Sequence, residues 1–268
     1  MEKVFIDTHA HLLDKKLPNI EEVVNNYQSV GVKKVINMAC CVKTARECAM
    51  LSEKYDSVYF GAGIHPQDIK EATDADLDEI KKIAMHDKCV CIGEIGLDYY
   101  WDKSYIDIQK EMLVKELEIA NELKLPFSFH SREATLDTLT LLKQNKDKIK
   151  HGGVIHCFSG SKETARELLN LGLKIGIGGT ATFKNARHTS EVLEFVPAEE
   201  ILTETDCPYL SPEPFRGKVN EPKNIPIILD FIANKKGIDS IELSQIIYKT
   251  AIELFTKLKE KNKAKNNS

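Results

Sequence analysis

The feature that most constrains the fold of this chain is a regular alternation between short apolar segments and longer amphipathic segments. The short segments are almost continuously apolar, which is typical of strands that are buried on both faces of a parallel sheet. Eight segments have this character: Lys3–Thr8, Lys34–Ala39, Val58–Gly63, Cys89–Ile95, Pro126–His130, Val154–Cys157, Leu173–Gly178 and Ile201–Thr205. The pattern predicts a parallel sheet whose strands are separated by helices.

The longer segments repeat their apolar residues with the period of a helix. They are Ile20–Val30, Thr44–Lys54, Leu77–His86, Ile106–Leu123, Ala134–Lys143, Lys162–Leu171 and His188–Phe195, followed by a final helical region over Ile225–Asn234 and Ile241–Lys259. A count of eight strands favours a closed barrel over an open doubly wound sheet. The 268 residues give roughly 33 residues per strand and helix, the usual size in such a barrel. The predicted fold is an α/β protein with a (β/α)8 TIM barrel.

The boundaries of this barrel follow from composition. No Gly/Ser/Pro-rich linker divides the chain, so we expect a single domain over residues 1–256. The Pro-rich stretch Cys207–Pro226 follows the last predicted strand, where loops belong to the catalytic face of a barrel. Residues 257–268 are polar and rich in Lys and Asn, and we expect them to form a solvated tail with no function of its own.

The charge of the chain excludes one class of protein. The 37 Lys and Arg residues against 41 Asp and Glu residues give a net charge of −4. The chain is therefore not a protein that binds nucleic acid through an extended basic surface. A nucleic acid that is held at one point as a substrate remains compatible with this charge.

The cellular location is predicted from the N-terminus and from the cysteines. A short apolar run near Met1 leads directly into Asp7, and no stretch approaches the ~20 apolar residues of a membrane span. The seven cysteines are odd in number, lie mostly in apolar segments and form no CxxC pair. We expect a cytoplasmic protein with reduced thiols, without membrane contact and without an obligate protein partner.

Metal-binding side chains gather at the ends of the predicted strands, where a barrel of this kind places its active site. The first strand runs into His9 and His11, and the alternation of side chains along a strand points both imidazoles to the same side. Satisfied core histidines and solvated acids would have no reason to segregate in this way. The remaining donors at these ends are Glu94, His130, His156 and Asp206.

These six donors are four imidazoles and two carboxylates, a mixture that suits Zn²⁺, Mn²⁺, Co²⁺ or Mg²⁺. Six donors exceed the needs of one tetrahedral ion with an open position, and they suit two ions ~3.5–4 Å apart that share a bridging group. Glu94 lies between the two histidine pairs in strand order, so it is the predicted bridge. The first ion would take His9, His11, Glu94 and Asp206, and the second would take Glu94, His130 and His156.

Six motifs of this chain resemble those of the TatD family of metal-dependent deoxyribonucleases. They are DTHAHL (7–12), GIHP (63–66), GEIGLDYY (93–100), FHSREA (129–134), HCFSG (156–160) and ETDCPYLSP (204–212). The resemblance extends from residue 7 to about residue 222, and the six ligand positions show no departure from the family pattern. It implies a TIM barrel, the same six metal ligands, and hydrolysis of DNA phosphodiester bonds, often as a 3′→5′ exonuclease.

The donors also predict a mechanism. A divalent ion lowers the pKa of its bound water towards ~7, so hydroxide is available at neutral pH to attack phosphorus in line. Asp206 is the expected residue that orients and deprotonates this water. Glu204 either assists or anchors a ligand from behind. His65 follows the third strand and is not needed as a ligand, so we expect it to bind the substrate phosphate or to protonate the leaving group. A hydrogen-bonded loop histidine is the alternative for His65.

Two arginines on the predicted active face are candidates for binding the substrate phosphates, since a guanidinium group suits phosphate oxygens. Arg132 follows the fifth strand and Arg216 lies in the loop after the eighth, although ordinary salt bridges with Glu133 or Glu213 are equally compatible with the sequence. The aromatic run 99–101 after the fourth strand either stacks an unpaired base or forms a hydrophobic plug over the barrel rim. The expected substrate is DNA, as a single strand or at 3′ ends.

Other functions remain open at this point. A related barrel hydrolase could cut a misacylated tRNA, a small ester or amide, or a phosphotriester. Many such barrels bridge their metals with a modified lysine, whereas Glu94 occupies that place here, which favours the nuclease. A non-catalytic metal- or nucleic-acid-binding protein is disfavoured because every predicted ligand and Asp206 are present.

Overall fold

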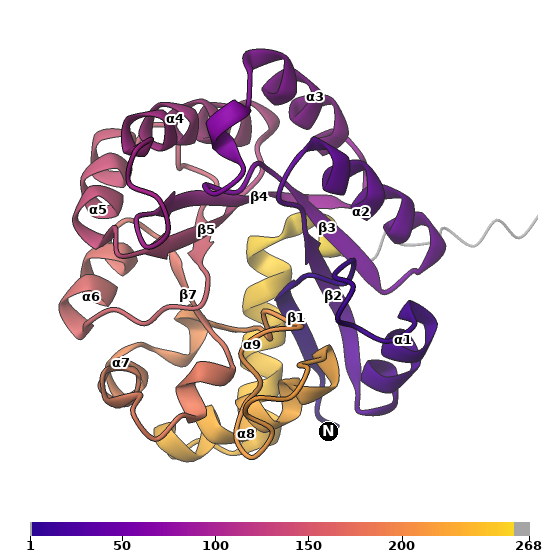
Figure 1. The fold of residues 1–268 in the computed structure, drawn as a ribbon. Coiled ribbons are helices and arrows are strands. Elements are labelled where there is room, and N and C mark those ends of the chain that lie inside the picture. The colour runs from indigo at the N-terminus through magenta and orange to yellow at the C-terminus, as the bar shows by residue number, and fades with distance from the viewer. Residues whose placement is uncertain (1, 260–268) are drawn as a thin grey trace, which may run out of the picture.

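The structure is a computed structural model that describes residues 2–259. Within these residues eight strands form one parallel sheet, in which each strand pairs with the next along the chain (Figure 1). The strands are β1 (Phe5–Ala10), β2 (Val32–Met38), β3 (Val58–Ala62), β4 (Cys89–Asp98), β5 (Phe127–Arg132), β6 (Gly153–Ile155), β7 (Lys174–Ile177) and β8 (Ile201–Thr203). The predicted (β/α)8 barrel is confirmed.

The helices surround this sheet, as Figure 1 shows. They are α1 (Ile20–Ser29), α2 (Val42–Lys54), α3 (Asp74–Ala84), α4 (Ile106–Leu123), α5 (Thr135–Gln144), α6 (Lys162–Asn170), α7 (Arg187–Phe195), α8 (Ile225–Lys236) and α9 (Ser240–Leu254). Short 3₁₀ helices lie at Ile69–Glu71, Gly179–Thr182, Ala198–Glu200, Pro222–Asn224 and Thr256–Leu258. Each of these α-helices overlaps a segment that the apolar period predicts.

Every strand ends within one to three residues of its predicted end, and three of these differences affect the site. β4 continues beyond Ile95 because its pairing with β5 extends to the pair Asp98 and Arg132. β6 and β8 end early, because Cys157 and Asp206 have φ angles of +46° and +55° in the left-handed region, which interrupts an extended strand. His156 and Asp206 therefore lie just beyond their strands, at the mouth of the barrel.

The barrel closes where β8 meets β1. Ala10 and Cys207 form an isolated parallel bridge, and the Thr8 hydroxyl donates a hydrogen bond to the Thr203 carbonyl at 3.1 Å. Just above this bridge the Asp206 N–H donates to the His9 carbonyl at 2.9 Å. These bonds join segments that are almost two hundred residues apart, and they place Asp206 beside the histidines of the first strand.

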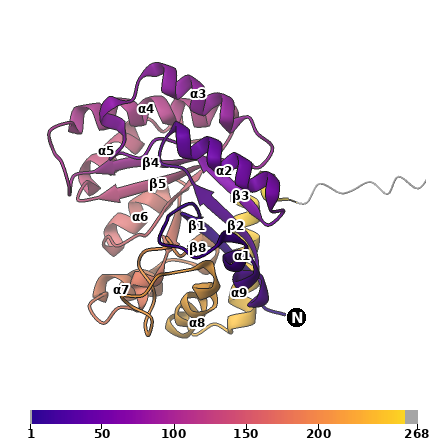
Figure 2. The ribbon, with the colours of Figure 1, turned by 45° about the vertical axis from the view of Figure 1, so that its right-hand side comes forward.

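The opposite end of the barrel is filled by residues that follow α9. Phe255 and Leu258 are fully buried and pack with inward-facing strand residues such as Ile6, Val90 and Leu202. Figure 1 and Figure 2 both show α9, in yellow, next to β1. The packed chain thus continues past residue 256 to Leu258, whereas residues 260–268 of the expected tail lie outside the described residues.

Within residues 2–259, no helix is long and apolar enough to span a membrane.

Glu116 on α4 is a buried carboxyl that supports the loop after β3. Its Oε1 accepts a hydrogen bond of 2.8 Å from the N–H of Ile64, which directly precedes His65. Its Oε2 is buried and has no hydrogen-bond partner among the described residues. Burial raises the pKa of Glu116 well above its ordinary value, so this carboxyl is held in its neutral form.

The variant E116Q tests this burial through the pH dependence of stability. In the wild type, Glu116 ionises at its ordinary pKa only when the chain unfolds, so the free energy of unfolding falls as the pH rises above that value. The glutamine variant lacks this loss, so its stability relative to the wild type grows with pH, by up to ~1.4 kcal/mol per pH unit. Urea unfolding of both proteins between about pH 5 and pH 8 measures the difference. A difference that stays constant with pH would contradict the assignment.

Candidate metal centre

The structure brings all six predicted ligands together at the carboxyl ends of the strands. His9 lies in β1 and Glu94 in β4, both buried within the barrel. His130 lies in β5, while the other three lie just beyond β1, β6 and β8. Four overlapping groups among these side chains and their neighbours bring ligand atoms within 4.8 Å of one another.

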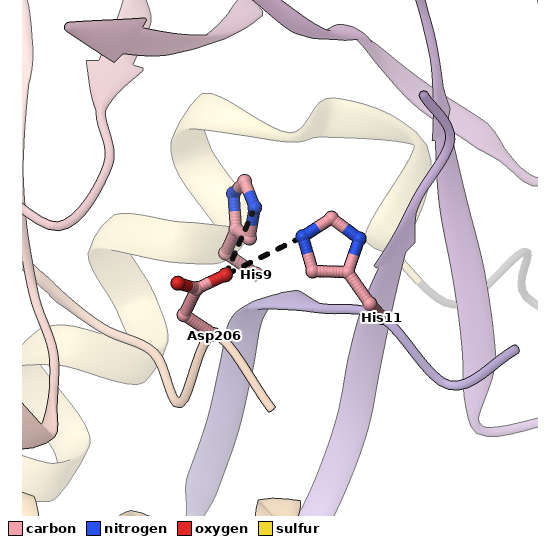
Figure 3. A group of neighbouring side chains, drawn as sticks. All are labelled: His9, His11 and Asp206. Atoms are coloured by element: carbon pink, nitrogen blue, oxygen red, sulfur yellow. Dashed lines mark ion pairs between the residues drawn. The ribbon is translucent and has the colours of Figure 1, made fainter. Parts of the chain in front are cut away.

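One group of donors consists of His9, His11, Asp206 and one oxygen of Glu94. The Nε2 atoms of His9 and His11 lie 3.3 and 3.4 Å from Glu94 Oε2, and 3.8 and 3.3 Å from Asp206 Oδ1. Figure 3 shows both imidazoles turned towards this Asp206 oxygen. A tetrahedral zinc ion with bonds of about 2.0–2.1 Å requires donor atoms about 3.3–3.4 Å apart. The first group fits such an ion.

A second group faces the other oxygen of the same carboxylate. Glu94 Oε1 lies 3.0 Å from His130 Nδ1 and 2.9 Å from His156 Nε2. These two ring nitrogens are 3.2 Å apart. Glu94 therefore presents one oxygen to each group, which is the arrangement that the sequence predicts for a bridging ligand.

Two of the donors, His9 and Glu94, are in the protonation states that bind metal. Burial lowers the pKa of His9 to about 4, so its imidazole is neutral, and its buried Nε2 has no hydrogen-bond partner in the described chain. Burial alone would raise the pKa of Glu94, but the charge of His156 and the hydrogen bond of His11 hold it well below its ordinary value. A neutral imidazole with a free nitrogen and an ionised carboxylate are the forms that bind a divalent cation.

In three of the ligand histidines, the ring nitrogen that points away from the donor group has a side-chain partner that the sequence analysis does not predict. His9 Nδ1 lies 3.2 Å from the Ser128 hydroxyl, and His11 Nδ1 lies 4.0 Å from the Cys40 thiol. His130 Nε2 lies 3.1 Å from Asp98 Oδ2. Of these, only Asp98 carried a sequence signal, since it is a carboxylate within the GEIGLDYY motif.

Glu204 lies behind the donors and not in the cavity. It is fully buried, and its Oε1 accepts a short hydrogen bond from the Cys157 N–H. The same oxygen is 3.8 Å from His156 Nδ1. Burial raises the pKa of Glu204 to about 8. Its buried position behind His156 offers no path to a substrate, and its anchoring role stays a prediction.

His65 faces the second group from the loop after β3. Its Nδ1 accepts a hydrogen bond of 3.1 Å from the Gln67 N–H, so Nε2 carries the proton of the neutral ring. This Nε2 is 3.6 Å from Glu94 Oε1. Burial lowers the pKa of His65 to about 4. The side chain is therefore a neutral hydrogen-bond donor aimed at the site.

A cavity of about 620 Å³ opens above the donors. Arg132, Trp101 and Tyr209 are among the residues that line it. The Arg132 guanidinium lies 3.8 Å from the centre of the Tyr100 ring and 5.5 Å from that of Trp101. Its sequence neighbour Glu133 pairs instead with Lys103, at 3.9 Å.

The structure changes the interpretation of two predicted substrate contacts, Arg216 and the aromatic run 99–101. Arg216 is exposed, stacks on Phe183 at 4.2 Å and is not among the residues that line the cavity. In the aromatic run, Tyr99 is buried and donates to Asp137, whereas Trp101 is 65% exposed. A plug over the rim would be buried, so this exposure favours a contact surface.

The fold and the donors together define a barrel of the metal-dependent hydrolase class. The family described as TatD related DNase matches residues 6–256. The chain therefore belongs to the TatD family, and it is a metal-dependent hydrolase.

Individual relatives agree with this assignment. The metal-dependent hydrolase YabD of Bacillus subtilis is 40% identical, over 94% of this chain and 99% of that protein. The hydrolase YcfH of Escherichia coli is 33% identical, over 93% and 95%. The crystal structure of YjjV, a TatD homologue from E. coli, superposes with a TM-score of 0.88 at 29% identity and covers 94% of this chain and 98% of that one.

Proposed function

We propose that this chain is a deoxyribonuclease that removes nucleotides from 3′ ends of DNA with two divalent metal ions. The observation that carries the proposal is the position of Glu94, whose two oxygens face two separate groups of imidazoles. One carboxylate between two donor groups suits a pair of ions, and paired ions are typical of phosphodiester hydrolysis. The family description supports DNA as the substrate.

The donors divide between the ions as the distances suggest. His9, His11, Asp206 and Glu94 Oε2 would hold one ion, and Glu94 Oε1, His130 and His156 would hold the other. Zn²⁺, Mn²⁺, Co²⁺ and Mg²⁺ are the candidates for such nitrogen and oxygen donors. When bound, such ions supply hydroxide near neutral pH and neutralise charge on the phosphate oxygens.

Asp206 is the proposed general base. Burial would raise its pKa, but the hydrogen bond and the charge of His11, with His156 and His9, lower it, so the carboxylate is ionised and able to accept a proton. Oδ1 faces the two imidazoles, and Figure 3 shows the second oxygen turned away from them. This second oxygen is the proposed acceptor of the proton from the attacking water.

His65 and Arg132 would act on the substrate itself. The Nε2–H of His65 is proposed to donate a hydrogen bond to a phosphate oxygen or to the leaving 3′ oxygen of the penultimate nucleotide. Arg132 provides a cation for the phosphate, and the neighbouring rings of Tyr100 and Trp101 provide faces on which an unpaired base can stack. Binding of the substrate through these few side chains is compatible with the net negative charge of the chain.

The variant E94Q tests the central group. Glutamine keeps the size of the side chain but removes the charge that both ions would share, so hydrolysis of single-stranded DNA should fall by at least ~10²-fold. Release of mononucleotides from oligonucleotides labelled at the 3′ or the 5′ end measures both the rate and the direction.

The matched control is E47Q, which removes a carboxylate from the rim of the same cavity and should keep most of the activity. Unchanged hydrolysis by E94Q would refute the two-metal site. Brisk cleavage of small esters by the wild type without any release of nucleotides would refute the nuclease.

The variant H65A separates the two proposed actions of His65. If the Nε2–H of His65 stabilises the charge on the leaving oxygen through a hydrogen bond, the loss of kcat on an oligonucleotide is ~10²–10³-fold. A thymidine 5′-phosphate ester of p-nitrophenol has a leaving group that needs no such stabilisation, so its hydrolysis would fall far less. Equal losses on both substrates would show that His65 binds phosphate instead, and no loss on either would remove it from the site.

Fluorescence of Trp101, the single tryptophan of the chain, tests the stacking surface. Addition of a phosphorothioate single strand, which resists hydrolysis, should quench this fluorescence. Stacking is worth ~1–3 kcal/mol per base, so W101A should weaken binding of the strand by about 5- to 150-fold. Unchanged fluorescence together with unchanged affinity of W101A would contradict a stacking role.

A further inference from the structure

We propose that Asp98 is a positioning residue, which holds His130 in the one tautomer that binds metal and ties it to the two loops that face the substrate. The inference rests on the proposed two-metal function, since it assigns a role to the second group of donors. Asp98 ends β4 and is 1% exposed. It lies four residues after Glu94 on the same strand and is not one of the six donors.

The carboxylate of Asp98 accepts hydrogen bonds from three separate parts of the structure. Oδ2 lies 3.1 Å from His130 Nε2 and accepts a bond of 3.0 Å from the Gln67 side-chain amide. Oδ1 accepts a bond of 2.9 Å from the Tyr100 N–H. An ionised carboxylate is an acceptor only, so all three partners must be donors.

The main chain of Asp98 is fixed independently of these contacts. The buried side chain of Gln109 on α4 accepts from the Asp98 N–H at 2.8 Å, and its amide donates to the Asp98 carbonyl at 2.9 Å. The position of Asp98 therefore does not depend on its contact with His130. For this reason Asp98 can orient the imidazole of His130.

The consequence for His130 is a defined tautomer. Because Asp98 can only accept, the proton of the neutral ring must lie on Nε2, which leaves the lone pair on Nδ1. Nδ1 is the atom that lies 3.0 Å from Glu94 Oε1 and 3.2 Å from His156 Nε2. Asp98 thus directs the free nitrogen of His130 into the second donor group.

The other ligand histidines lack an equivalent partner. The hydroxyl of Ser128 beside His9 and the thiol of Cys40 beside His11 are each able to donate or accept. For His156, whose Nε2 faces Glu94, the outward Nδ1 lies 3.8 Å from the Glu204 carboxylate, too far for a hydrogen bond. Among the four imidazoles, therefore, His130 has the tautomer that its surroundings determine most strictly.

The same carboxylate also reaches the residues that face the substrate. Gln67 donates to Asp98 through its side chain and to His65 Nδ1 through its main chain. Tyr100, whose N–H is held by Asp98, stacks under Arg132. The carboxylate of Asp98 thus sets the relative positions of three groups. They are His130 as a proposed metal ligand, His65 as a proposed hydrogen-bond donor to the substrate, and Arg132 as a proposed phosphate-binding residue.

Titration calorimetry of Zn²⁺ into the metal-free wild type, D98N and D102N tests the inference without using activity. Asparagine keeps the shape but replaces one oxygen with an amide NH2 group, which is a donor, so it cannot accept from all three donors. We expect D98N to bind one of two Zn²⁺ ions ~10–100-fold more weakly and to leave the other unchanged. D102N removes a carboxylate from the same loop that instead pairs with Lys70 and should match the wild type.

Two results would overturn the inference: unchanged affinity of D98N for both ions, or an equal loss at both, which would mean that Asp98 only supports the fold. If D98N does not fold, long-range ¹H–¹⁵N spectra of the zinc-loaded wild type give the answer. They should place the His130 proton on Nε2, and a proton on Nδ1 would overturn the inference. A wild type that binds two ions but cleaves no DNA would refute the proposed function and leave the role of Asp98 intact.

Discussion

The site depends on one buried carboxylate that is shared by two groups of imidazoles. Burying the charge of Glu94 costs several kcal/mol unless partners replace the lost water. Four ring nitrogens lie within 3.4 Å of its two oxygens, and they lower its pKa well below the ordinary value despite burial. These partners come from β1, β5 and the segment after β6, so the geometry around Glu94 requires the barrel to be correctly assembled.

Closure of the barrel completes this geometry. Asp206 reaches His9 and His11 only because the end of β8 is bonded to β1 through Ala10 and Cys207. The far end is stabilised by Phe255 and Leu258, which fill the space between the strands. The polar mouth and the apolar base therefore belong to one cooperative structure, in which the packing at one end supports the donors at the other.

Much of the site is predictable because parallel strands fix where the side chains at their carboxyl ends lie. The period of the apolar segments predicts the eight strands, and parallel strands deliver the residues at their carboxyl ends to one face, so His130 and Asp206 were expected to meet. The exact strand ends were not predictable, since the left-handed conformation of Cys157 is set by tertiary contacts.

Partners that depend on distances across the fold were also missed. Nothing in the sequence pairs Ser128 with His9 or Gln109 with Asp98. Arg216 shares the predicted face with Arg132, yet the path of its long loop places it against Phe183, outside the cavity lining. A loop lacks the fixed period that locates side chains on a strand or helix, so its residues can be assigned to a face but not to a contact.

The most direct test of the account is anomalous scattering from a crystal of the protein grown with Mn²⁺. The account predicts two peaks on either side of the Glu94 carboxylate, one flanked by His9, His11 and Asp206 and the other by His130 and His156. A single peak, or peaks that do not contact Glu94, would contradict the shared carboxylate on which the proposed function depends.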